Sequence, residues 1–179
     1  MKKYFLLLLC LFAVPAFAQA DRTWNLDQST LTYHMSHPLH EVEGVSHAAL
    51  GKGVCHAGMC DFLLAVQVKT FDSGDSNRDL HMLQVTRGGL YPIVTVRFRL
   101  PVAEIDSPAL DCDLEVQFAG NTAHYAHVIF HQTIEGNSRH ITGTIPSTLT
   151  DFKIDPPSFL TIPIKNEIPV RVDMMWHPS

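Results

Sequence analysis

Residues 71–100 read FDSGDSNRDLHMLQVTRGGLYPIVTVRFRL, and the pattern changes from helix to strand part-way along this stretch. Its first half predicts a short helix over Asp75–Gln84, because good N-cap residues stand at its start and Gly88-Gly89 follows it. From Val94 to Leu100 apolar and polar residues alternate, as in a strand with one buried face. The stretch therefore predicts a β-sheet domain with one helical insert.

The same alternation recurs along the rest of the chain. Further alternating runs lie at 31–36, 64–69, 110–118, 124–133, 141–145 and 168–176. Turn residues separate them, for example Gly120-Asn121 and Gly136-Asn137. Together they predict an all-β domain of roughly eight antiparallel strands over residues 21–179. Periodicity alone leaves two architectures open, a sandwich of two sheets and a closed barrel.

The first 20 residues, MKKYFLLLLCLFAVPAFAQA, have the layout of a cleavable secretory signal: two lysines, an apolar run and small residues near the end. The apolar run from Tyr4 to Phe17 is shorter than the ~20 residues that a membrane-spanning helix needs. We therefore expect residues 1–20 to be removed and residues 21–179 to reach a bacterial periplasm without a membrane span.

Charge and motifs narrow the function. The chain has 13 Lys and Arg against 18 Asp and Glu, a net charge of −5, and its basic residues are scattered. Nucleic-acid binding needs clustered basic residues, so we expect no nucleic-acid partner. The sequence has no Gly-x-Ser-x-Gly elbow, no phosphate loop and no His-Glu-x-x-His helix. We therefore expect a binding protein and not an enzyme.

Three cysteines follow the predicted signal: Cys55, Cys60 and Cys112. In an oxidising compartment we expect Cys55 and Cys60 to form a disulfide that closes a tight hairpin. Cys112 shares an apolar face with Leu110 and Leu114, which predicts a buried and inert thiol.

An alternative joins Cys55, His56, Met59 and Cys60 into a soft metal site, and the 11 histidines of the chain give it some support. The spacing matches no standard zinc module and no haem-attachment motif, so we predict no metal ligands. Strict alternation would place His124 and His131 on opposite faces of one strand.

In the predicted helix, Arg78 and Asp79 are interpreted as a pair that ties the helix to the rest of the fold. His81 lies in the same helix, and both a structural role and a hydrogen bond to a ligand head group stay open for it.

Four motifs, in this order and spacing, resemble the YceI-like family of periplasmic polyisoprenoid-binding proteins. They are Trp24-Asn25-Leu26-Asp27, Arg78-Asp79-Leu80-His81-Met82, Tyr91-Pro92 before the strand of residues 94–98, and Asp151-Phe152-Lys153-Ile154. The resemblance implies an extended lipocalin-like barrel whose lumen holds the tail of a long isoprenoid, such as a quinone or a polyprenyl lipid. Two departures leave the ligand open: Lys153 stands where the family usually has glycine, and residues 121–124 replace a Gly-Val-Thr turn.

In such a barrel the inward apolar side chains would take an alkyl chain out of water, at roughly 0.8 kcal/mol per buried methylene. The residues that we predict to bind lipid are Leu31, Tyr33, Leu64, Val66, Val68, Val94, Val96, Phe98, Leu114, Val116, Phe118 and Phe130. The ligand would be an isoprenoid or other long-chain lipid, with no further cofactor. Two alternatives remain: a metal- or haem-binding protein on the same scaffold, and a partner-binding module whose barrel is filled by its own side chains.

Overall fold

The computed structural model describes residues 22–179, so the predicted signal sequence lies outside the described residues. The strands are β1 (Arg22–His37), β2 (His40–Ser46), β3 (Leu50–His56), β4 (Met59–Gln67), β5 (Ile93–Pro101), β6 (Ala109–Phe118), β7 (Asn121–Glu135), β8 (Ser138–Ile145), β9 (Ser158–Phe159), β10 (Ile162–Pro163) and β11 (Val170–Pro178). The helical segments are α1 (Ser76–Val85) and the 3₁₀ turns η1 (Val68–Thr70), η2 (Val102–Glu104) and η3 (Thr150–Phe152).

Eight strands close into an antiparallel barrel in the order β1-β3-β4-β5-β6-β7-β8-β11, and β11 pairs again with β1. The closing pair runs from Trp24 opposite Pro178 to Tyr33 opposite Val170. On the other edge of β1, β3 pairs with its first residues and β2 with its last. The predicted all-β barrel of roughly eight strands with one short helix is confirmed, and closure decides against the sandwich.

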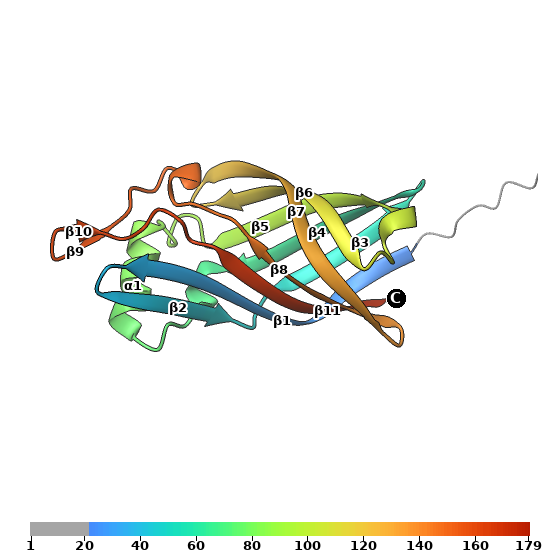
Figure 1. Ribbon diagram of the computed structural model, residues 1–179, viewed down its shortest axis with the longest axis horizontal. Helices are drawn as coiled ribbons and strands as arrows, with labels where there is room; N and C mark the ends of the chain where they lie inside the picture. Colours follow the sequence, from blue (N-terminus) through green and yellow to red (C-terminus); the bar gives the residue numbers. More distant parts are fainter. Residues whose placement is uncertain (1–21) are drawn as a thin grey trace, which may run out of the picture.

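The barrel is elongated, and its two ends differ (Figure 1). Helix α1, the β1–β2 hairpin and the β9–β10 hairpin gather at one end, which we call the helix end. The start of β1, the C-terminus and the turn between β3 and β4 lie at the opposite end. This turn carries a disulfide, so we call the second end the disulfide end.

Helix α1 begins where the sequence predicts it. The carboxylate of Asp75 accepts hydrogen bonds from the backbone N–H groups of Asn77 and Arg78, at 2.9 and 3.2 Å. The helix ends before Gly88-Gly89, because Arg87 takes the left-handed conformation with φ 54°. The N–H of Arg87 binds the carbonyl of Gln84 and the N–H of Gly88 that of Leu83, which is a Schellman cap.

A β-bulge in the β6–β7 pair changes which residues face inward. The register shifts between Cys112 and Leu114, and opposite this point His127 has a φ of 56°. Inward positions are odd-numbered before the bulge and even-numbered after it. As a result His124 and His131 both lie exposed on the outer face, and the expectation that they face opposite sides is wrong.

Candidate functional site

The barrel contains a cavity of about 280 Å³ with an almost entirely apolar lining. Seven of the eight barrel strands contribute residues to it, as do α1 and the segment before β11. On β5 the inward side chains Val94, Val96 and Phe98 are only half-buried, although they point away from solvent. They keep exposed surface because the lumen beside them is open.

All twelve residues that the sequence predicted for the lumen line this cavity. They are Leu31, Tyr33, Leu64, Val66, Val68, Val94, Val96, Phe98, Leu114, Val116, Phe118 and Phe130. Eleven of them lie on barrel strands, where alternation predicted their direction, and Val68 lies in η1 directly after β4. Their contact with a lipid stays a prediction.

Other residues that line the cavity were not predicted from the sequence. The inward faces of β8 and β11 contribute Ile141, Ile145, Val172, Met174 and Trp176, and the same alternation could have found them. It could not have found the inner face of α1, because alternation with a period of two does not apply to a helix.

Helix α1 lies at the mouth of the cavity. Its lumen-facing side consists of Arg78, His81, Met82 and Val85, at helical spacing i, i+3, i+4 and i+7. By contrast, the side chain of Leu80 is 56% exposed. None of the helical residues is buried, so α1 covers the opening without filling it.

Polar contacts at the helix end differ from the predicted pair. Arg78 forms its ion pair with Asp75 at 3.7 Å. Asp79 instead accepts hydrogen bonds from the backbone N–H and the hydroxyl of Ser73, at 3.1 and 2.6 Å. Burial, and to a smaller extent Asp79, raise the pKa of Tyr33, while Arg78 opposes this shift. The Tyr33 hydroxyl therefore stays neutral beside these charges.

At the disulfide end the cavity is closed by nearly fully buried side chains. Trp24 and Cys112 are each 1% exposed there. The guanidinium of Arg139 lies 5.5 Å from the centre of the Trp24 ring and donates to Asp106 at 3.0 and 2.6 Å. The side-chain amide of Gln132 donates to the backbone carbonyls of Ile105 and Ser107, which follow η2. Arg139 and Gln132 have hydrogen-bond partners, whereas Nε1 of Trp24 is buried without one among the described residues. These side chains fill the disulfide end and form the floor of the cavity, so its opening lies at the helix end, where no residue of α1 is buried.

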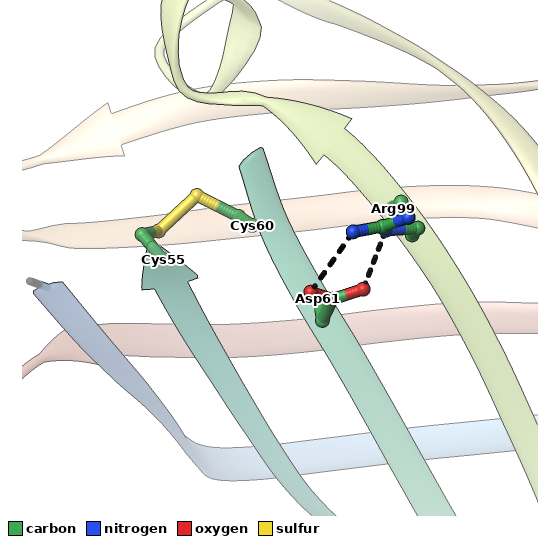
Figure 2. The surroundings of a disulfide bond; sticks show 4 residues. All are labelled: Cys55, Cys60, Asp61 and Arg99. Atoms are coloured by element: carbon green, nitrogen blue, oxygen red, sulfur yellow. Dashed lines mark hydrogen bonds and ion pairs between the residues drawn. A yellow bond between two sulfur atoms is a disulfide. The ribbon is translucent and has the colours of Figure 1, made fainter. Parts of the chain in front are cut away.

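Cys55 and Cys60 form the predicted disulfide across the β3–β4 turn, with their Cα atoms 3.9 Å apart (Figure 2). Next to it Asp61 binds Arg99 of β5 on the outer face, at 2.6 Å. Cys112 is free and buried, and burial together with nearby acidic side chains raises the pKa of its thiol to about 12. It is therefore a protonated, unreactive part of the core at neutral pH.

The soft metal site weighed above needs free thiolates, and the disulfide removes them. Several histidines instead pair with carboxylates: His127 with Asp111 at 3.1 Å and His140 with Asp173 at 2.8 Å. Within residues 22–179, no three His, Cys, Asp or Glu side chains are grouped so that they could hold a metal ion. No helix in this range has the length and apolar character needed to cross a bilayer.

Solved structures share this architecture across most of the chain. A polyisoprenoid-binding domain from Saccharophagus degradans superposes with a TM-score of 0.72 at 12% identity, covering 87% of this chain and 98% of that domain. Burkholderia cenocepacia BcnA superposes with a TM-score of 0.69 at 13% identity, covering 82% of this chain and 95% of BcnA. The Campylobacter jejuni YceI protein superposes with a TM-score of 0.52 at 13% identity, covering 98% of this chain and 97% of that protein.

The chain has the YceI fold. No family model matches its sequence, and no curated protein matches it either. At 12 and 13% identity the structural likeness establishes the fold alone. The resemblance inferred from the four sequence motifs is confirmed at that level, and within this YceI fold the lumen opens beneath α1.

Proposed function

We propose that this protein binds one isoprenoid or similar long-chain lipid in its lumen and carries it without chemical change. The observation that supports this most is the apolar cavity of about 280 Å³ inside the closed barrel. A barrel filled by its own side chains, the alternative considered above, would leave no such space. The likeness to a domain described as polyisoprenoid-binding supports the choice of ligand class.

The size of the cavity sets the energy available for binding. An apolar cavity of ~150 Å³ accommodates a benzene molecule, so 280 Å³ accommodates on the order of a dozen carbon atoms. At ~0.8 kcal/mol for each buried methylene, their transfer from water contributes about 10 kcal/mol. Association and ordering of the chain cost at least about 4 kcal/mol, which leaves about 6 kcal/mol or less and therefore a dissociation constant of tens of micromolar or weaker.

The geometry supports entry of the tail from the helix end. The floor at the disulfide end is occupied by Trp24 and by Arg139 with its partners. A tail that enters beneath α1 leaves its polar head beside Arg78 and His81. We place this activity in the periplasm, because residues 1–20 have the layout of a secretory signal and a disulfide needs an oxidising compartment.

The direct test is native mass spectrometry of protein purified gently from the periplasm of its host. We expect a species with the mass of the chain plus one lipid. In solution, a fluorescent farnesol analogue should bind at a ratio of one per chain. If no lipid co-purifies and the analogue does not bind, the proposed function is wrong.

A variant locates the binding site. Val96 projects into the lumen from the middle of β5, so Val96→Trp should block the cavity and weaken binding of the farnesol analogue at least about tenfold. Thr95→Trp is the matched control, since Thr95 lies on the opposite face of the same strand and should leave binding unchanged. Circular dichroism checks that both variants are folded. Undiminished binding by folded Val96→Trp would place the lipid elsewhere.

A further inference from the structure

Every glycine within the described strands lies beneath an aromatic ring, so that a Cβ atom there would meet the ring. These glycines are Gly44 in β2, Gly51 and Gly53 in β3, and Gly143 in β8. A Cβ atom at any of them would come within 3.0 Å of ring atoms, those of Tyr33, Trp176, Phe62 and Phe130 in that order. Only the missing side chain lets the rings lie so close to the wall.

Three of the four glycines stand directly opposite, on the neighbouring strand, the aromatic residue whose ring covers them. Gly44 stands opposite Tyr33, Gly53 opposite Phe62, and Gly143 opposite Phe130. In each pair the ring folds over its partner strand and does not stand upright in the lumen. β3 shows the effect most clearly: rings cover Gly51 and Gly53, and β3 is the one barrel strand with no residue in the cavity lining.

The ring of Phe62 has little freedom to move sideways. The ring of Phe62 stacks on Phe98 with centroids 4.9 Å apart and planes 6° from parallel. It also meets Trp176 edge-on at 5.5 Å. With Gly53 beneath it and these rings beside it, Phe62 can be displaced only toward the lumen.

We infer that the glycine–aromatic pairs set the bore of the lumen, and that this bore admits a single slender hydrocarbon chain while rejecting two-chain phospholipids and fused-ring sterols. This inference rests on the proposed function, because it concerns the same lumen. The rings supply an apolar surface while leaving the centre of the barrel free. A fused ring system or a second hydrocarbon chain is wider, and the aromatic rings occupy the space that it would need.

The first test narrows the bore. Gly53→Ala and Gly143→Ala should each push a ring into the lumen and weaken binding of a fluorescent farnesol analogue about tenfold or more. Gly89→Ala is the matched control, because a Cβ atom at Gly89 meets nothing within 4 Å. In the double variant Gly53→Ala/Phe62→Leu the displaced ring is gone, so binding should return to within about threefold of the wild type.

The second test widens the bore. Phe62→Leu alone should gain binding of a fluorescent sterol that the wild type rejects. Wild-type protein that binds this sterol or a fluorescent phospholipid as tightly as the farnesol analogue overturns the inference. So do folded Gly53→Ala and Gly143→Ala variants with wild-type affinity, or a double variant that does not recover. In all these cases the wild type still binds the farnesol analogue, and the proposed function stands. A wild type that does not bind the analogue contradicts both the inference and the proposed function.

Discussion

At the scale of single residues, the backbone at Lys153 shows what a glycine in its place would contribute. Lys153 caps η3 in the left-handed conformation, with φ 56° and ψ 37°. Its neighbours hold it there: Phe152 is buried edge-on against Phe118, and Ile154 is buried as well. This explains the glycine at the corresponding position of the family pattern, because glycine adopts this conformation without steric strain.

We therefore predict that Lys153→Gly stabilises the protein. The left-handed conformation costs a non-glycine residue roughly 1–2 kcal/mol, and glycine removes this cost. The greater chain entropy of glycine in the unfolded state offsets about 0.5–1 kcal/mol of the gain. The free energy of unfolding should rise by about 0.5–1 kcal/mol, measured by urea denaturation. Lys153→Ala keeps the strain and serves as the control. An unchanged or lower stability of the glycine variant would show that Lys153 makes compensating contacts.

At the scale of elements, the N-cap of α1 depends on a charge. The hydrogen bonds from the backbone N–H groups of Arg78 and Asn77 lower the pKa of Asp75. A carboxyl whose pKa is lower in the folded state stabilises that state above its unfolded pKa, and this contribution disappears as the pH falls through the folded value. Acid should therefore loosen the helix that covers the mouth of the lumen.

We predict that α1 frays at its first turn below a pH of about 4. The amide NMR signals of Asn77 and Arg78 should then move toward random-coil positions, while those of the barrel strands stay in place. Asp75→Asn retains a capping side chain without a titrating group, so its first turn should be insensitive to pH over this range. Asp75→Ala should fray at every pH. Equal acid sensitivity of Asp75→Asn and the wild type would assign the transition to another group.

The elements also show why part of this structure could be predicted from the sequence. Period-two alternation depends on local backbone geometry, so it predicted the strands and the eleven strand residues of the predicted set that line the cavity. The bulge at His127 has no such local signal: its N–H is held by Asp113 of the neighbouring strand, at 3.0 Å. The inner face of α1 was missed for a related reason. Tertiary placement over an open mouth turned Arg78 and His81 inward and left Leu80 exposed.

At the scale of the whole molecule, the height and the open volume of the barrel would limit how much of the proposed lipid it encloses. Strands of nine residues such as β4, at about 3.3 Å per residue and a tilt of about 40°, give a barrel roughly 23 Å tall. The open volume of about 280 Å³ is smaller than this height would allow, because the aromatic rings and the floor take part of the interior. A longer tail must extend past α1 at the mouth.

We therefore predict that affinity rises with chain length and then levels off. Geraniol, farnesol and geranylgeraniol have about ten, fifteen and twenty carbons, and only the first fits wholly within a capacity on the order of a dozen. Farnesol should bind at least about tenfold more tightly than geraniol, since about two further buried carbons contribute roughly 1.6 kcal/mol. Geranylgeraniol should bind within about threefold of farnesol, because its additional carbons remain in water. Displacement of one fluorescent probe by each alcohol measures the series under the same conditions. A continued steep rise from farnesol to geranylgeraniol would mean that the side chains of the lumen move apart to admit the longer tail.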